Sequence, residues 1–130
     1  MVGFAVISYR VNKVDGLLAQ GLGTSMLQIP NIVKNWKIWL APCFASVITG
    51  PIATCVFKLK NTPLGAGMGT SGLVGILETF NAMGDSDFST TMVAVLLTYI
   101  ILPAVLSLLF HNLFKKMNLV KDEDLYLNLK

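Results

Sequence analysis

Residues 88–114 read FSTTMVAVLLTYIILPAVLSLLFHNLF, and this stretch decides the fold. Its 27 residues contain no Asp, Glu, Lys or Arg, whereas about 20 apolar residues suffice for a helix to cross a bilayer. A second stretch, residues 38–57 (IWLAPCFASVITGPIATCVF), has twenty residues without a charge. In it Ala41, Ala45 and Thr49 recur every four residues, which predicts a face for close helix contact. We therefore predict an all-α membrane protein with two transmembrane helices.

The composition agrees with a membrane protein. Hydrophobic residues make up 54% of the 130 residues and charged residues only 13%, against roughly a quarter charged in soluble domains. The net charge of +3 does not indicate nucleic acid, because the basic residues border the apolar runs in pairs, as is typical of bilayer flanks. We expect membrane lipid and no nucleic acid as partners. The pairs are Arg10/Lys13, Lys34/Lys37, Lys58/Lys60 and Lys115/Lys116.

The same charges give a partial orientation. Asp85 and Asp87 precede the second span and Lys115/Lys116 follow it, so the positive-inside tendency places its C-terminal end in the cytoplasm. Around the first span, Lys34/Lys37 oppose Lys58/Lys60, and its orientation stays open.

Two glycine-rich segments, residues 16–33 and 61–84, are apolar but unsuited to a simple membrane helix. Residues 61–77 hold five glycines, and each costs about 1 kcal/mol relative to Ala in a helix interior. We predict re-entrant loops or broken helices, whose bare backbone groups are tolerated at membrane depth when buried in protein or facing a wet cavity.

The two ends of the chain are less regular. Residues 1–9 are apolar but too short to span, and we expect the end of a helix that begins outside this chain. Residues 115–130 form a polar tail, for which a solvated terminus is the default. Leu125, Leu127 and Leu129 alternate with Tyr126 and Asn128, a pattern that hints at a short strand or an extended end as the alternative to this default.

Two short motifs repeat each other. Residues 21–27 (GLGTSML) and 67–73 (GMGTSGL) agree at five of seven positions. The second fits the G-x-G-x-x-G pattern of dinucleotide-binding loops, but that pattern needs a preceding buried strand. Residues 57–66 (FKLKNTPLGA) contain two lysines and a proline instead, and no Lys-Ser or Lys-Thr pair follows the glycines as in a P-loop. We interpret the pair as a possible internal repeat, since transporters often bind substrate between repeats on discontinuous helices.

The motifs and their neighbours supply the candidate substrate-binding residues. Glycines allow close approach of a ligand, while hydroxyls, amides and freed backbone groups bind sugar hydroxyls or an anion. The alternative is that the small residues only pack helices together. Glu78 is the one ionisable residue between Lys60 and Asp85, and such a group near the membrane interior is a functional candidate. We expect no metal, cofactor or catalytic residue, and the candidates are Gly21, Gly23, Thr24, Ser25, Gln28, Asn31, Gly67, Gly69, Thr70, Ser71 and Glu78.

Residues 20–35 (QGLGTSMLQIPNIVKN), 65–75 (GAGMGTSGLVG) and 81–84 (NAMG) resemble the C-terminal half of the membrane IIC component of the sugar phosphotransferase system. The similar branch includes regulators of a clostridial pore-forming toxin. The resemblance implies a sugar permease of the bacterial cytoplasmic membrane, usually a homodimer, that works with IIA and IIB phosphocarrier proteins. It also implies that a chain without the N-terminal half lacks a complete substrate pathway.

The resemblance bears on Glu78 and leaves three functions open. In better understood IIC families a glutamate followed by proline contacts the sugar, which implies that role for Glu78, but Thr79 follows it here. This departure favours a membrane sensor or regulator that kept the permease fold without phosphotransfer, as the alternative to transport. In a third, purely structural reading the chain is a helical packing module, and Thr24 and Thr70 matter through stability alone.

Overall fold

The computed structural model describes residues 1–84 and 86–128, and the regular secondary structure within them is helical. Asp85 and Leu129, which entered the predictions above, lie outside the described residues. The α-helices are α1 (Val2–Ile7), α2 (Tyr9–Leu18), α3 (Ile29–Lys34), α4 (Leu40–Pro51), α5 (Val74–Ala82), α6 (Phe88–Val95) and α7 (Leu102–Lys116). Three π-helical stretches, η1 (Ala19–Gly23), η4 (Ile52–Val56) and η6 (Leu96–Ile101), and four 3₁₀ turns, η2 (Ser25–Gln28), η3 (Trp36–Trp39), η5 (Ser71–Leu73) and η7 (Asp122–Leu125), join them.

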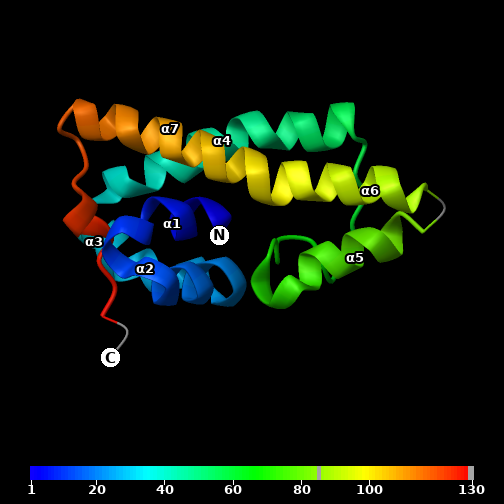
Figure 1. Ribbon diagram of the computed structural model, residues 1–130, viewed down its shortest axis with the longest axis horizontal. Helices are drawn as coiled ribbons and strands as arrows, with labels where there is room; N and C mark the ends of the chain where they lie inside the picture. Colours follow the sequence, from blue (N-terminus) through cyan, green and yellow to red (C-terminus); the bar gives the residue numbers. More distant parts are fainter. Residues whose placement is uncertain (85, 129–130) are drawn as a thin grey trace.

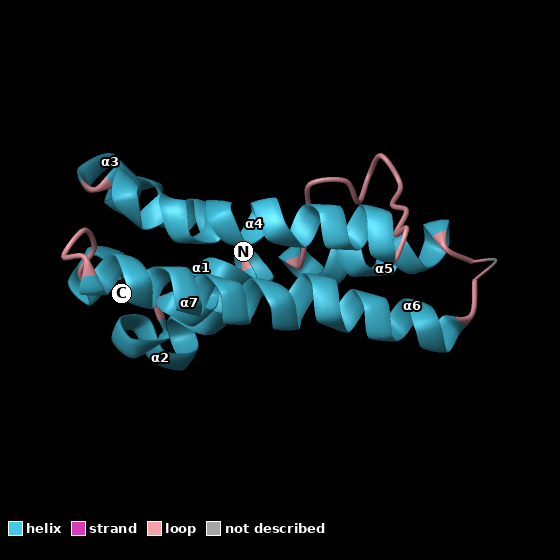
Figure 2. Cartoon of the chain, turned by 90° about the horizontal axis from the view of Figure 1, so that it is seen from above, coloured by secondary structure: helices cyan, strands magenta, loops and turns pink. Residues whose placement is uncertain are grey.

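Two continuous helical segments are long and apolar enough to cross a membrane, which confirms the two predicted spans. They cover Trp36–Val56, with 21 residues, and Phe88–Lys116, with 29 residues. The ring of Phe44, near the start of α4, lies 6.0 Å from that of Phe114, near the end of α7, so the two spans pack antiparallel. They run side by side along the long axis of the molecule, with α1 packed against α7 (Figures 1 and 2).

Among the described residues, buried polar side chains are as frequent as buried apolar ones, and many large apolar side chains are exposed. Gln20, Gln28 and Thr79 are completely buried, whereas Val47 is 68% and Leu109 60% exposed. Such a surface suits lipid, because buried polar groups satisfy one another while apolar side chains face the hydrocarbon. The predicted small-residue face of Ala41, Ala45 and Thr49 is buried, which confirms it as a helix contact.

The two glycine-rich segments are broken helices that form hairpins. In the first hairpin, residues 9–34, α2 and η1 run toward the middle of the molecule, the chain turns at the extended Thr24 and returns through η2 and α3. In the second hairpin, residues 60–82, an irregular segment without regular secondary structure runs inward from the opposite end, and α5 runs back. Figure 1 shows the tips facing each other near the middle of the long axis. The breaks agree with the prediction, and a re-entrant position in a bilayer stays a prediction.

The C-terminal tail is docked and not solvated, so the default expectation was wrong. Leu125 is completely buried in a core cluster that includes Phe4 and Ile38. The amide of Asn12 holds the extended end, donating to the Leu125 carbonyl at 2.7 Å and accepting from the Leu127 amide at 2.7 Å. This pairing of a side chain with two backbone groups explains why Leu127 is buried while no strand forms there.

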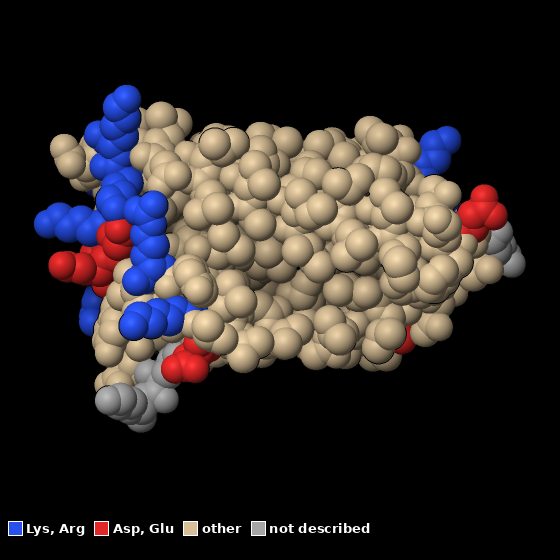
Figure 3. Space-filling model, in the orientation of Figure 1, with Lys and Arg blue, Asp and Glu red and all other residues tan. Residues whose placement is uncertain are grey.

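Most Lys and Arg residues of the described chain lie at one end of the molecule. The tail, the base of the first hairpin, the start of the first span and the end of α7 converge there, because residues from all four share one core cluster or hydrogen-bond to it. Figure 3 shows charged side chains at the two ends of the long axis and an uncharged band between them. The convergent segments carry Arg10, Lys13, Lys34, Lys37, Lys115, Lys116 and Lys121, whereas Lys58 and Lys60 follow the other end of the first span.

Asp122 ties the tail to α7. Its carboxylate contacts His111 Nε2 at 3.2 Å and the Lys115 ammonium. Burial alone would raise the pKa of Asp122, but the hydrogen bonds and charges of Lys115 and His111 outweigh it and hold the pKa below its usual range. The ion pair therefore favours the docked tail at neutral pH.

Candidate functional site

The two G-x-G-T-S motifs bind each other at the hairpin tips. Thr70 Oγ1 donates to the carbonyl of Gly21 at 2.5 Å, and Ser71 Oγ donates to the carbonyl of Gly23 at 2.8 Å. The acceptors lie at the C-terminal end of the first hairpin's helical arm, where carbonyls lack intrahelical partners. We call these two hydrogen bonds the tip clasp.

Backbone freedom at the tips explains why glycines are needed there. Gly67 and Gly69 have φ values of 85° and 57°, in the left-handed region that side chains disfavour. Gly75 on α5 packs directly on the backbone of Gly69, because an added Cβ would lie 2.3 Å from the Gly69 carbonyl oxygen. The second tip therefore folds back tightly onto α5 and presents Thr70 to the first tip.

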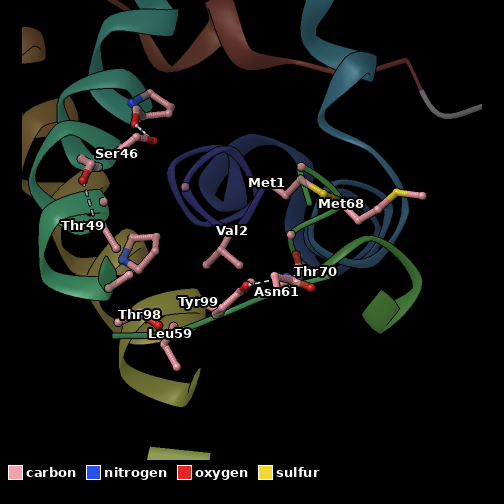
Figure 4. Close-up of a pocket in the computed structure, with 18 of the residues that line it drawn as sticks. Met1, Val2, Ser46, Thr49, Leu59, Asn61, Met68, Thr70, Thr98 and Tyr99 are labelled. Carbon is pink, nitrogen blue, oxygen red and sulfur yellow. Dashed lines mark hydrogen bonds between the residues drawn. The ribbon is translucent and has the colours of Figure 1, made fainter. Parts of the chain in front are cut away.

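A cavity of about 710 Å³ lies beside the clasp. It is partly open and is lined by α1, by the two spans, by Ser25 of the first hairpin and by the irregular segment of the second hairpin. Figure 4 shows Ser46 and Thr49 on α4 facing it across from Asn61 and Thr70. Of the predicted residues, Ser25, Gly67, Gly69 and Thr70 line it. Its other polar lining side chains are Ser46, Thr49, Thr54, Lys60, Asn61, Thr98, Tyr99 and Ser107.

The cavity wall is more apolar than polar by area, but it carries many neutral polar groups and few charged ones. Thr49 and Thr98 donate their hydroxyl protons to the carbonyls of Ala45 and Ala94, at 2.8 and 2.7 Å, which leaves oxygen lone pairs free to accept. The hydroxyl of Ser107 is completely buried and has no hydrogen-bond partner among the described residues. Among the described lining residues only Lys60 has a charged side chain. Such a wall can bind a neutral molecule rich in hydroxyl groups.

A π-helical stretch of the second span brings Thr98 and Tyr99 to the cavity. It covers Leu96–Ile101 and ends just before Pro103. Proline has no backbone N–H to donate, and its ring clashes with the carbonyl four residues earlier, so a wider turn accommodates it. The same wide turn places two polar side chains on the inner face of a span that is otherwise apolar.

Tyr99 closes a ring of hydrogen bonds that fixes the second hairpin to this span. Asn61 Nδ2 donates to Tyr99 Oη at 3.2 Å and to the Gly75 carbonyl at 3.1 Å. Thr79 Oγ1 donates to the same carbonyl at 2.7 Å, so it accepts the Tyr99 proton across 3.0 Å. The donors run in one direction from Asn61 through Tyr99 to Thr79, and the Gly75 carbonyl accepts at both ends, so the bonds along this chain strengthen one another.

Glu78 lies behind the cavity wall and does not line it. Its carboxylate accepts from Thr62 Oγ1 at 2.6 Å and from Asn81 Nδ2 at 3.2 Å. Thr62 Oγ1 in turn accepts from the amide of Gly65 at 3.2 Å. In this conformation Glu78 therefore stabilises the irregular segment of the second hairpin. Direct contact of its carboxylate with a sugar stays a prediction.

Two predicted residues lie at the docked tail, away from the cavity. Gln28 Nε2 donates to the Leu125 carbonyl at 3.0 Å and to Gln20 Oε1 at 3.1 Å. Asn31 Nδ2 donates to the Tyr126 carbonyl at 2.8 Å. The structure therefore separates Gln28 and Asn31 from the other candidates and uses their amides to hold the tail. Thr24, also predicted, accepts the Met26 amide at 3.1 Å and so caps the turn of the first tip.

Several cavity residues were missed by sequence reasoning. Asn61, Thr98, Tyr99 and Ser107 were not among the candidates, although each is a polar residue in or beside an apolar run. Polar residues inside predicted spans were thus the available signal. The signal does not tell which of them face the cavity, because the π-helical stretch changes the angular positions that a regular helix would give.

Comparison with known proteins identifies the family of this chain. A family model described as "Phosphotransferase system, EIIC" matches residues 1–127. No curated protein and no solved structure matches the chain significantly. The match includes both hairpins, both spans and the docked tail, so it bears on the whole site.

Proposed function

The chain belongs to the EIIC family, the membrane permease component of the sugar phosphotransferase system, and we propose that its cavity binds a neutral sugar on its way to phosphorylation by a IIB partner. The observation that carries the proposal is the hydroxyl-rich, nearly uncharged cavity beside the tip clasp. A free sugar has many hydroxyl groups and no charge, so it suits a wall of neutral donors and acceptors.

The size and composition of the cavity support a sugar. Its volume of about 710 Å³ lies within the range of roughly 300–1,000 Å³ common for small-molecule sites. The free lone pairs of Thr49 and Thr98 accept from sugar hydroxyls, and the Ser107 hydroxyl gains a partner. The ring of Tyr99 adds an apolar surface beside them, of the kind that commonly lines small-molecule sites.

The gathered positive charge supports an orientation for both spans. The basic end carries seven Lys and Arg residues from convergent segments, against Lys58 and Lys60 at the other end of the first span. The positive-inside tendency then places the basic end in the cytoplasm, with the C-terminus and the start of the first span. Soluble IIA and IIB phosphocarriers would act at that end, and the resemblance to IIC proteins favours a homodimer in the cytoplasmic membrane.

The test is sugar uptake by cells that express the intact protein with its phosphocarriers. The probes are radiolabelled glucose, N-acetylglucosamine, mannitol and cellobiose. Thr49→Val and Thr98→Val each remove one cavity hydroxyl, and loss of one neutral hydrogen bond should raise the apparent KM about 2- to 10-fold. Thr90→Val is the matched control, because Thr90 is exposed on α6 and does not line this cavity. Unchanged KM in both cavity variants, or no uptake of any sugar by the parent, contradicts the proposal.

The alternative is a membrane sensor that binds sugar without transport. Thr79 favours it, because its hydroxyl locks the second hairpin to Tyr99 at the position where the resemblance implies a proline. Equilibrium binding separates the two functions. A transporter shows uptake that depends on phosphoenolpyruvate, whereas a sensor binds the same sugar in purified form while cells accumulate none.

A further inference from the structure

The tip clasp uses polar groups that the membrane interior would otherwise leave bare. The carbonyls of Gly21 and Gly23 end a helical arm and have no partner within it, and the hydroxyls of Thr70 and Ser71 satisfy them. The tips meet within the uncharged band seen between the charged ends (Figures 1 and 3). Unsatisfied polar groups are costly at such depth, so separation of the tips is favoured when another polar molecule replaces each partner.

The clasp also forms part of the cavity wall. Gly69 and Thr70 line the cavity, whereas Gly21, Gly23 and Ser71 do not. The two hydrogen bonds therefore lie on the side of the wall that faces the first hairpin. A molecule that leaves the cavity between the two tips must break both bonds.

We propose that the tip clasp is the closed gate of the permeation path, an inference that rests on the proposed sugar transport. Sugar hydroxyls have the chemistry to open it, because each hydroxyl both donates and accepts. They donate to the freed carbonyls of Gly21 and Gly23 and accept from Thr70 and Ser71, which exchanges two protein hydrogen bonds for bonds to the sugar. Thr70 and Ser71 are thus positioning residues that couple the two hairpins, and the sugar separates the tips by replacing both hydrogen bonds.

A reversible cross-link tests the gate directly. Cys43 and Cys55 are first replaced by Ala in the intact protein, and Gly23→Cys is then combined with Ser71→Cys. An added Cβ on Gly23 meets no atom within 4 Å, and Ser71 Oγ already lies 2.8 Å from the Gly23 carbonyl. The probe is whichever of glucose, N-acetylglucosamine, mannitol and cellobiose the cysteine-free parent transports. Oxidation with copper phenanthroline should abolish its uptake, and dithiothreitol should restore it. The oxidised cysteine-free parent and the two single-cysteine variants are the controls.

Weakening the clasp gives the opposite prediction. Thr70→Val with Ser71→Ala removes both donors, and the loss of two hydrogen bonds should raise the open fraction about 5- to 100-fold. We expect a matching rise in efflux of unphosphorylated sugar from preloaded membrane vesicles, with the protein still folded by thermal unfolding in detergent.

The outcomes separate the two proposals. Uptake by the parent, blocked by oxidation and restored by reduction, supports the gate. Normal uptake by a cross-linked protein, or efflux from the double variant equal to that of the parent, overturns the gate and leaves sugar transport standing. If the wild type takes up sugar but the cysteine-free parent does not, the cross-link cannot be read out. The efflux measurement then decides whether the clasp is a gate, because it uses no cysteine variant. Absence of uptake in the wild type overturns both proposals.

Discussion

Gly75→Ala should destabilise the protein although alanine is the better helix former. Gly75 lies in α5, where an added Cβ would lie 2.3 Å from the carbonyl oxygen of Gly69 and 2.9 Å from its amide nitrogen. Ordinary contacts begin at 3.4 Å, so the difference requires the Gly69 backbone to move by 1.1 Å. Because the obstacle is backbone and not a flexible side chain, the second hairpin has to shift as a unit.

The magnitude follows from two opposing terms. Alanine gains about 1 kcal/mol of helix propensity over glycine, while overpacking costs typically about 1–3 kcal/mol and occasionally more. With a rigid backbone obstacle we take the upper end, which leaves a net destabilisation of about 2 kcal/mol. A shift of that size in the residue next to Thr70 disturbs the hydrogen bond from Thr70 to the Gly21 carbonyl, now 2.5 Å long. Gly75→Ala should therefore also weaken the tip clasp.

The assay is thermal unfolding in detergent micelles, followed by far-UV circular dichroism at one fixed scan rate. We expect the apparent Tm of Gly75→Ala to fall by about 5–10 °C. Gly50→Ala is the matched control, because Gly50 also lies in a helix but an added Cβ there meets no atom within 4 Å. Its Tm should stay level or rise slightly. An unchanged or higher Tm for Gly75→Ala would refute the close approach of α5 to the second tip.

Three further predictions concern single polar side chains. Tyr99→Phe removes the hydroxyl that closes the hydrogen-bond ring, and should lower the free energy of unfolding by about 1–2 kcal/mol in denaturant titration. Glu78→Gln keeps an acceptor for the Thr62 hydroxyl whereas Glu78→Ala does not, so uptake should survive the first change and fall at least about 3-fold with the second. Asp122→Asn should lower stability by about 0.5–1 kcal/mol at pH 7. The pairing of Asp122 with Lys115 lowers the pKa of the carboxyl from 3.8, so that difference is fully present above pH 4 and disappears as the pH falls through the lower folded pKa.

Each of these has a control or a contrary result. Tyr9→Phe changes the same group at a side chain that is 49% exposed, and an equal loss in both variants would speak against the ring. Equal damage by Glu78→Gln and Glu78→Ala would show that the charge itself matters, in favour of direct sugar contact. A stability difference for Asp122→Asn that is the same at pH 3 and pH 7 would exclude the ion pair as its source.

Sequence reasoning worked where local properties decide. The uncharged runs predicted both spans, because a helix satisfies its own backbone wherever a long apolar segment enters lipid. The glycines predicted the breaks, since positive φ values such as that of Gly67 require them. The polarity of residues 115–130 wrongly predicted a solvated tail. Leu125 and Leu127 are buried through contacts with Asn12, more than a hundred residues earlier.

The sequence by itself determined a helical membrane protein with two spans, two glycine-broken segments and a repeated G-x-G-T-S motif. Only the tertiary structure decided that Thr70 and Ser71 bind the twin motif, that Gln28 and Asn31 hold the tail, and that Tyr99 reaches the cavity. It also decided which basic pairs share one end of the molecule. The charges along the chain alone had left the orientation of the first span open, because basic residues flank both of its ends. The physical reason is that hydropathy and backbone freedom are local, whereas the partner of a hydroxyl or a lysine depends on which distant segments pack beside it.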